Sequence, residues 1–356
     1  MPLRIAWVIP GPLDQMTGGY IYDRRMVEGL RARGHDVMVL RVPTRVPYLD
    51  PLAGLSLARS LRAGRFSTII IDELAHPAMW WGLRLGKRSQ EPTQPACLTL
   101  VHHLRASETD GWRRHVARLA ERQALRVANG IVCTSHTTAT VVRELIGPGT
   151  PISVVTPGVH AAPERDGAHD GGEPSRPGRL ICVAHLTPRK GIVSLLHALA
   201  RAAPAAELDL VGDATRDPTH AAYIRALLRE LNLGTRVRIR GTVSDAELQQ
   251  LLITADAFVL ASTYEGYGMA IADAVAAGLP VIATRTGAIP EVVRDGLEAE
   301  LVPPNDVTAL TTAIDRLVSD RAERDRRAGH ARERARSLPT WEQACAAFVE
   351  IVEDAG

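Results

Sequence analysis

A strand, helix and strand in close succession constrain the fold of this chain more than any other feature. The apolar run Ala257–Leu260 is typical of a buried strand, and an Ala-rich segment with high helix propensity follows it and ends at Gly278. A second apolar run begins directly afterwards, at 280–283. One crossover helix between two apolar strands predicts a parallel pair, and therefore an α/β fold with doubly wound parallel sheets.

The connection from the first of these strands into the helix carries the residues that suggest a site. It contains Glu265 and two glycines, and Asp273 follows about two helical turns later. A helix start has unpaired N–H groups and a positive dipole end, and glycines allow close approach of a ligand. We therefore expect the backbone of Gly268, Met269 and Ala270 to face a phosphate, and both carboxylates to face the same ligand.

This segment resembles the donor site of the retaining glycosyltransferases of family 4 (glycosyl transferases group 1), which have the GT-B fold. Their signature is Glu, seven residues and a second Glu, in a phrase such as E-G-F-G. Here it reads Glu265-Gly-Tyr-Gly-Met-Ala-Ile-Ala-Asp273, with aspartate in second place. The phrases at 278–284, 287–293 and 301–304 match the family as well. An ordinary βαβ unit would account for Gly278 and Pro280. It would not account for Glu265, the two glycines after it and Asp273 together.

The resemblance implies two Rossmann-like domains facing a central cleft. The C-terminal domain would bind a nucleoside diphosphate sugar, with UDP or GDP as the nucleotide, and the N-terminal domain would bind the acceptor. The sugar would pass to an acceptor hydroxyl with retention of configuration and without a metal or other cofactor. Glu265 would contact the sugar or the positive side of the transition state, and Asp273 would accept the ribose hydroxyls.

The length of 356 residues is consistent with two domains. We expect a first domain at 1–160, a linker at 161–177 that is rich in Gly, Pro and charge, and a second domain at 178–339. The resemblance implies that a last helix, at about 340–356, crosses back to the first domain. There is no apolar run of 18 residues and no signal-peptide pattern, and the four cysteines are widely spaced, so a cytoplasmic protein with reduced thiols is expected.

The chain opens with an apolar strand at 3–10, a Gly-rich loop at 11–20, a helix from Tyr20 and a second strand at 35–40. This order is typical of a doubly wound domain. The dinucleotide pattern G-x-G-x-x-G is absent, which disfavours a dinucleotide-dependent oxidoreductase. In family 4 a Gly-Gly loop at this place approaches the donor phosphates, and the matching residues here are Gly18 and Gly19.

Two further apolar runs, 68–71 and 97–101, are typical of strands, and the second leads into His102 and His103. The carboxyl edge of an open parallel sheet is where such folds bind ligands. The resemblance implies that His102 lies near the transferred sugar, and His103 is expected to contact the acceptor. A metal site is not expected, because adjacent histidines point apart and no acidic third ligand occurs at the usual spacing.

The second domain opens with a strand at 180–184 and the phrase 184–191, which resembles the family phrase G-R-L-x-P-x-K-G. Lys190 matches its lysine, and the resemblance implies that this ammonium neutralises the donor diphosphate. His185 stands where the family has arginine, so Arg189, or His185 when protonated, would have to compensate. In the family, the loop that matches 241–243 borders the nucleotide base, so the resemblance implies that Val243 contacts the base. The residues expected to be catalytic are thus His102, Lys190 and Glu265.

Charge is unevenly distributed along the chain. Up to Arg165 there are 21 basic and 13 acidic residues, although the whole chain carries a net charge of only +2. This basic N-terminal half could favour an anionic acceptor or an anionic membrane surface. It could equally be a solvated basic surface. A helix expected at 112–129 bears a basic stripe that suggests either a peripheral contact with a membrane or a solvated face; its members are Arg114, Arg118, Arg122 and Arg126. Aromatic residues make up 4% of the chain, so nucleic-acid binding has little support.

Other functions remain open at this level. The alternatives are another GT-B enzyme, such as a sugar-nucleotide epimerase or a glycoside phosphorylase, and a non-catalytic partner subunit that binds a sugar nucleotide. His185 and Asp273 differ from the residues of the family pattern, which keeps a non-catalytic partner subunit open. The acceptor, whether small molecule, lipid, glycan or protein, is expected on the variable loops at 11–20, 41–57 and 102–112.

Overall fold

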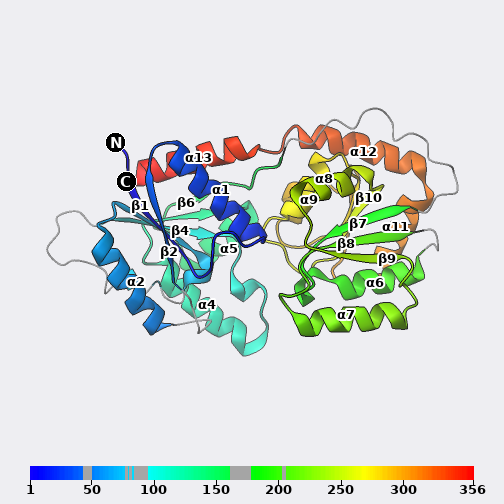
Figure 1. The fold of residues 1–356 in the computed structure, drawn as a ribbon, viewed down its shortest axis with the longest axis horizontal. Helices are drawn as coiled ribbons and strands as arrows, with labels where there is room; N and C mark the ends of the chain where they lie inside the picture. Colours follow the sequence, from blue (N-terminus) through cyan, green and yellow to red (C-terminus); the bar gives the residue numbers. More distant parts are fainter. Residues whose placement is uncertain (43–49, 77–78, 80–81, 84–94, 161–177, 203–205) are drawn as a thin grey trace. The chain divides into compact units, whose positions relative to one another are not determined.

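The computed structural model describes the chain except for residues 43–49, 77–78, 80–81, 84–94, 161–177 and 203–205, so the expected linker lies outside the described residues. The chain forms two compact units (Figure 1). Unit 1 comprises Met1–Gly158 and Pro339–Gly356, and unit 2 comprises Val159–Leu338. Each contains a six-stranded parallel sheet, which confirms the predicted α/β fold class.

The sheet of unit 1 has the strand order β2-β1-β3-β4-β5-β6. Its strands, in that order, are β2 (Asp36–Arg41), β1 (Arg4–Ile9), β3 (Thr68–Asp72), β4 (Ala96–Val101), β5 (Gly130–Cys133) and β6 (Ile152–Val154). The chain moves from β1 outward to β2, then returns to the other side of β1 for β3. The strand order therefore reverses between β1 and β3, and the carboxyl ends of these strands flank the crevice where doubly wound sheets bind ligands.

The helical elements of unit 1 are α1 (Gly18–Ala32), α2 (Pro51–Gly64), η1 (Glu73–Ala75), η2 (Arg105–Ser107), α4 (Gly111–Leu125), α5 (His136–Ile146) and α13 (Trp341–Ala355). The expectation of a binding loop throughout 41–57 is wrong from residue 51 onward, because α2 begins there. The Asp50 carboxylate accepts a hydrogen bond from the Ala53 amide at 3.0 Å, and Ala53 and Leu57 are buried along one face. Residues 43–49 lie outside the described residues.

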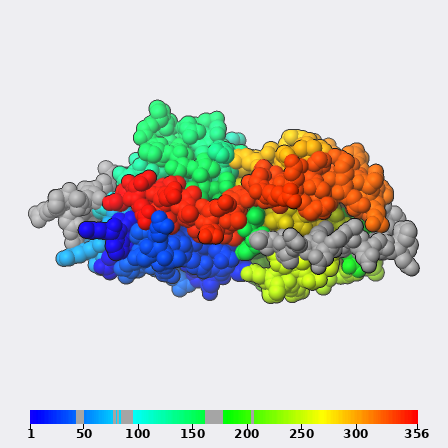
Figure 2. Space-filling model, turned by 90° about the horizontal axis from the view of Figure 1, so that it is seen from above, coloured from blue at the N-terminus to red at the C-terminus, as the bar shows by residue number. Residues whose placement is uncertain are grey.

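The last helix, α13, packs on unit 1. The ring of Phe348 lies 5.7 Å from that of Trp7 in β1, and both side chains are buried. At the start of the helix Thr340 forms a capping box with Gln343. In Figure 2 the red α13 lies along the blue N-terminal part of unit 1. The final segment of the chain thus completes the core around the first strand.

The sheet of unit 2 has the order β12-β11-β10-β7-β8-β9. These strands are β12 (Ala299–Val302), β11 (Val281–Thr284), β10 (Ala257–Leu260), β7 (Arg179–Val183), β8 (Glu207–Val211) and β9 (Val237–Gly241). The helical elements are η3 (Pro188–Lys190), α6 (Ile192–Arg201), α7 (Pro218–Glu230), α8 (Asp245–Thr254), α9 (Met269–Ala276), α10 (Ile289–Val292), α11 (Val307–Ser319) and α12 (Arg321–Ala335).

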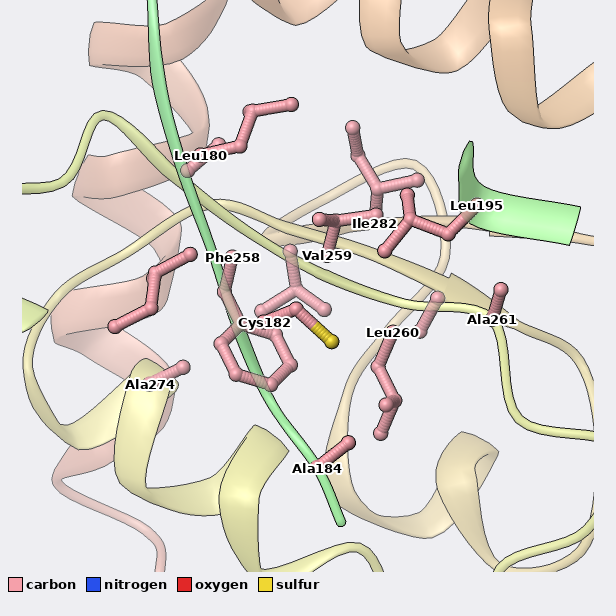
Figure 3. Close-up of a cluster of buried hydrophobic side chains, with 14 of the residues drawn as sticks. Leu180, Cys182, Ala184, Leu195, Phe258, Val259, Leu260, Ala261, Ala274 and Ile282 are labelled. Carbon is pink, nitrogen blue, oxygen red and sulfur yellow. The ribbon is translucent and has the colours of Figure 1, made fainter. Parts of the chain in front are cut away.

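The core of unit 2 is built on its two central strands. Phe258, Val259 and Leu260 of β10 pack with Cys182 of β7 and Leu195 of α6 (Figure 3). All five side chains are buried, as expected for strands covered on both faces. The first strand of this unit, β7, pairs with β8 on one side and β10 on the other, so the strand order reverses between β7 and β10.

Candidate active site

In unit 2 the segments that follow β7 and β10 meet at the reversal of strand order. Lys190 and Arg189 follow β7, and Glu265 follows β10. The Lys190 Nζ atom lies 2.6 Å from Glu265 Oε1, and Arg189 Nη1 lies 3.4 Å from Glu265 Oε2. The structure therefore brings together three predicted site residues that are about 75 positions apart in sequence.

The side chains of Glu265 and Lys190 are largely buried, with exposed fractions of 8% and 16%. Burial alone raises the pKa of Glu265, but the positive charges of Lys190 and Arg189 outweigh burial and lower the pKa to about 2. Glu265 is therefore ionised at neutral pH, and the Lys190 ammonium is held in one place by its partner.

Two hydroxyl groups that the sequence analysis did not identify support this pair. Ser262 Oγ donates a hydrogen bond to Glu265 Oε1 at 2.6 Å, and Thr284 Oγ1 donates to the Ser262 carbonyl. Both residues are buried. Arg189 Nη1 also donates to the Tyr264 carbonyl at 2.8 Å, so the guanidinium bridges the backbone and the carboxylate of the same loop.

The loop after Glu265 leads directly into α9. Gly268 is the N-cap residue and has a φ of 104°, in the left-handed region that favours glycine. The amides at the start of α9 therefore lie at the same carboxyl edge of the sheet as Lys190, as the sequence predicts. Asp273, one turn further into the helix, has its pKa raised to about 7, first by burial and then by the charge of Asp245 at the start of α8. Val243, directly before α8, packs partly buried against the core of unit 2.

His185 is held by the neighbouring strand. Its Nδ1 atom accepts a hydrogen bond from the Asp213 amide, which follows β8, at 3.2 Å. This contact uses the lone pair of Nδ1. That His185 replaces the missing arginine stays a prediction, and Arg189 is the cation next to Lys190 in sequence.

In unit 1 the predicted glycines and histidines also meet at the reversal of strand order. Gly18 and Gly19 follow β1 and form the first turn of α1, which begins two residues earlier than predicted because Thr17 caps it. A Cβ atom at Gly19 would lie 3.2 Å from His102 Cδ2. Because Gly19 has no side chain, the His102 ring has room beside it.

His102 is surrounded by acidic groups that the sequence analysis missed. Its Nε2 atom lies 3.3 Å from Asp23 Oδ1 and 3.5 Å from Asp72 Oδ2. Burial alone lowers the pKa of His102, but the hydrogen bonds to these two carboxylates and the charge of Glu73 outweigh burial and hold the pKa well above its usual value. Burial and the charge of Asp72 raise the pKa of Asp23.

His103 has a comparable environment closer to the surface. Its Nε2 atom lies 2.8 Å from Glu108 Oε1 and its Nδ1 atom lies 3.4 Å from Glu73 Oε1. Glu73 Oε2 also accepts hydrogen bonds from the backbone amides of both His102 and His103. Glu73 therefore holds the two histidines at the end of β4.

No acidic residue stands at the usual spacing from His102 in the sequence, but the fold brings two carboxylates to it. Ligand atoms of Asp23, Asp72 and His102 lie within 4.8 Å of one another, close enough to surround a cation. The acidic partners were missed because they lie 79 and 30 residues from His102 in sequence and meet it only through the strand order. The separations of 3.3 and 3.5 Å between nitrogen and oxygen atoms are also those of ion pairs within one cluster.

Helix α4 exposes apolar side chains as well as the arginines of the basic stripe. The residues of this helix that are buried are Ala117, Glu121, Ala124 and Leu125. Trp112 and Leu119 are exposed, with fractions of 70% and 62%, and Val116 is exposed as well. The four arginines of the basic stripe are also exposed. Within the described parts of the chain, no helix combines the length and apolar character that a membrane span requires.

Comparisons with known proteins match both halves of the chain to glycosyltransferases. The family described as Glycosyltransferase Family 4 matches residues 18–162, and the family described as Glycosyl transferases group 1 matches residues 168–334. The chain is 35% identical over 179 residues to MMP alpha-(1->4)-mannosyltransferase from Mycolicibacterium hassiacum, a match that covers 50% of this chain and 43% of that protein. It is 26% identical to glycogen synthase from Mycobacterium tuberculosis over 98% of this chain and 93% of that protein.

Solved structures share the fold. Sucrose-phosphate synthase from Thermosynechococcus elongatus superposes with a TM-score of 0.82 at 24% identity, covering 99% of this chain and 98% of that one. Anabaena HepE, in complex with UDP and glucose, superposes with a TM-score of 0.78 at 18% identity, covering 99% of this chain and all of that one. With both family matches, two doubly wound units and the predicted motifs in place, the chain belongs to the family 4 glycosyltransferases and has the GT-B fold.

Proposed function

We propose that this enzyme transfers a sugar from a UDP- or GDP-sugar to an acceptor hydroxyl, with retention at the anomeric carbon and without a metal. The observation that carries this proposal is the Lys190–Glu265 pair beside the start of α9. In the transfer the bond from the anomeric carbon to the diphosphate oxygen breaks, and a bond to the acceptor oxygen forms on the same face. The acceptor proton passes to the leaving diphosphate.

Each residue has a distinct role in this proposal. Lys190 and Arg189 stabilise the negative charge on the departing diphosphate, together with the amides at Gly268, Met269 and Ala270 and those at the start of α1, Gly18 and Gly19. Glu265 contacts sugar hydroxyls or the positive charge that develops on the sugar ring. Asp273 binds the ribose and Val243 contacts the base. His102 and His103 lie on the acceptor-binding unit, His102 toward the sugar and His103 toward the acceptor.

The first test is a thermal-shift screen with UDP, GDP, ADP and their common sugar conjugates. A ligand at about 100 times its dissociation constant adds about 2.7 kcal/mol to stability, which is readily measured. A shift confined to one nucleotide supports the donor site, and proton NMR of the product then reports anomeric configuration. Turnover that disappears in EDTA and returns with a divalent ion would contradict the metal-independent reaction.

A sugar-nucleotide-binding subunit without transferase activity is the second candidate. His185 stands where the family has an arginine, and burial and the charge of Asp245 raise the pKa of Asp273, which stands where the family has a glutamate, to about 7. Such a subunit would show a thermal shift with one nucleotide but neither transfer nor slow hydrolysis of the donor. A glycoside phosphorylase would instead turn over with inorganic phosphate and no nucleotide.

We further propose that α4 contacts an anionic membrane surface. Its exposed apolar residues Trp112, Val116 and Leu119 are spaced at i, i+4 and i+7, which places them on one face. That face adjoins the stripe of exposed arginines, a combination typical of interfacial helices. Sedimentation with vesicles of phosphatidylcholine, with and without phosphatidylglycerol, tests this contact. Binding that requires the anionic lipid and is lost in Leu119→Glu supports it, and equal recovery from both vesicles contradicts it.

A further inference from the structure

The two oxygen atoms of the Glu265 carboxylate have different surroundings. Oε1 accepts hydrogen bonds from Lys190 Nζ and from Ser262 Oγ, both at 2.6 Å. Oε2 has a single contact among the described residues, with Arg189 Nη1 at 3.4 Å. Because the pKa of Glu265 is about 2, the group is ionised at neutral pH and both oxygens act only as acceptors. The difference in their contacts determines which oxygen can still accept a hydrogen bond from a ligand.

The two donors at Oε1 use its whole capacity as an acceptor. A carboxylate oxygen has two lone pairs, and at Oε1 one of them faces the ammonium of Lys190 and the other the hydroxyl of Ser262. At Oε2 the contact of 3.4 Å with Arg189 is longer than an ordinary N–H···O hydrogen bond. Oε2 therefore keeps a lone pair for a ligand, and Oε1 does not.

The backbone of the segment from Ser262 to Glu265 is held by β11 and the loop that follows it. Thr284 Oγ1 donates to the Ser262 carbonyl, and the Ala288 amide donates to the Glu265 carbonyl at 3.0 Å. A Cβ atom at Gly287 would lie 2.0 Å from that same carbonyl oxygen, so the close approach requires glycine. Glu265 thus has a fixed backbone and one fixed oxygen, which gives Oε2 a defined direction.

The contact from Ser262 is of a different kind from that of Lys190. Ser262 is fully buried, with an exposed fraction of 0%, and its hydroxyl sits on a short side chain at the end of β10. Lys190 ends a flexible four-carbon stem. In the proposed reaction its ammonium is also attracted to the diphosphate, so it is shared between two anions once the donor binds. Ser262 is then the contact that keeps Oε1 in place.

We propose that Ser262 is a positioning residue that, with Lys190, keeps Oε1 of Glu265 occupied, so that Oε2 accepts a hydrogen bond from a hydroxyl group of the donor sugar. Thr284 acts one step further away, through the backbone of Ser262. The inference rests on the proposed function, because it takes Glu265 as the group that contacts the sugar. It adds which oxygen makes the contact and which residue directs that oxygen. The nucleotide part of the donor has no share in this contact.

The test is a calorimetric titration of the full chain with a nucleoside diphosphate and with its sugar conjugate, UDP against UDP-glucose and GDP against GDP-mannose. In Ser262→Ala the affinity for the sugar conjugate that binds should fall about tenfold, the lower end for one hydrogen bond to a charged group. The affinity for the nucleotide alone should not change. A merely structural serine would weaken both ligands equally or neither, and either result would overturn the proposal.

Deoxy donors, each lacking one hydroxyl of the sugar, test the contact with Oε2 directly. One of them should bind the unaltered enzyme about tenfold more weakly than the complete donor. The same deoxy donor should bind Ser262→Ala as well as the complete donor does, because the contact is already lost in that variant. If each deoxy donor loses the same factor in both proteins, Ser262 does not direct the contact.

Two further variants complete the experiment. Ser319→Ala is the matched control, because that hydroxyl donates to the Asp315 carbonyl at 2.6 Å in the last turn of α11, and it should change neither affinity. Thr284→Val should show a smaller loss that is also confined to the sugar conjugate, and it decides the result if Ser262→Ala does not fold.

The outcomes separate this inference from the proposed function. If the unaltered chain binds neither nucleotide nor sugar conjugate, both are wrong. If it binds both and the variants show no loss confined to the sugar conjugate, the donor site stands and only the role of Ser262 is rejected.

Discussion

The contact between Lys190 and Glu265 makes the sharpest prediction for unit 2. Lys190→Ala removes the cation nearest to a buried carboxylate, at 2.6 Å, and leaves Arg189 at 3.4 Å and the hydrogen bond from Ser262. The pKa of Glu265 is about 2, some 2.5 below the ordinary value of 4.5. If the variant loses all of this shift, the lost stability at pH 7 is about 3 kcal/mol, since one unit is worth about 1.4 kcal/mol.

This value agrees with the lower end of the range of about 3–5 kcal/mol for breaking a buried ion pair. For a unit of this size it corresponds to a decrease in Tm of roughly 6–12 °C. The effect on catalysis is separate: loss of one charge-stabilising donor should reduce kcat about 10²–10³-fold. Calorimetry and steady-state kinetics with a saturating donor measure the two effects independently.

A double-mutant cycle separates the pair from its surroundings. Lys190→Met combined with Glu265→Gln should recover most of the lost stability, because no unpaired charge remains, but should not recover activity. The matched control is Arg240→Ala at the more exposed Arg240–Asp209 pair of the same unit, which should cost about 1 kcal/mol or less. An unchanged Tm in Lys190→Ala would show that the ion pair does not form, and full retention of kcat would reject the catalytic role of Lys190.

Three further predictions follow from other contacts. Gly19→Ala places a methyl group 3.2 Å from the His102 ring, beside an amide proposed to face the diphosphate, and should reduce both kcat and the nucleotide thermal shift; unchanged values of both would contradict the role proposed for Gly19. Asp273→Glu should raise the affinity for the nucleotide about tenfold, by forming one more hydrogen bond from ribose to a charged group, and weaker binding in a titration would place the ribose elsewhere. Burial raises the pKa of Glu121 to about 7, so the folded state binds more protons than the unfolded state between about pH 4.5 and 7, and stability should fall as the pH rises through this interval. Urea unfolding at pH 5 and pH 8 should show a smaller decrease in Glu121→Gln, and an equal decrease in both proteins would contradict the assignment.

The sheets could be predicted from sequence because buried parallel strands are continuous apolar runs. Residues 68–71 and 97–101 are examples in which pattern alone locates the strand. Helix α2 was missed because its segment contains a glycine and a serine among small residues, which resembles a loop, although its buried residues recur at Ala53, Leu57 and Leu61. The helical spacing of the buried residues is present in the sequence, but the small residues around them obscure it.

The site was predicted where its residues lie within one motif, and missed where they come from different strands. Lys190 and Glu265 each stand in a recognisable phrase, and the structure shows that the phrases meet. Asp72 and Glu73 have no such phrase, yet they follow the apolar run 68–71 just as His102 and His103 follow 97–101. Because β3 and β4 are neighbours, their ends meet, and sequence alone did not show which strands pair.

The charges at the two sites differ from the charges of the chain segments that carry them. The N-terminal part of the sequence is basic, which suggested an anionic acceptor, but the carboxyl edge of its sheet gathers carboxylates: Asp23, Asp72, Glu73 and Glu108 surround the two histidines. The basic residues of α4 are exposed instead. In unit 2, which has the more acidic sequence, the site carries Lys190 and Arg189. Net charge thus predicts the long-range field of a unit, whereas the few side chains fixed at the strand ends set the potential that a substrate meets. Acceptor candidates should therefore be chosen from the contacts at His102 and His103 rather than from composition.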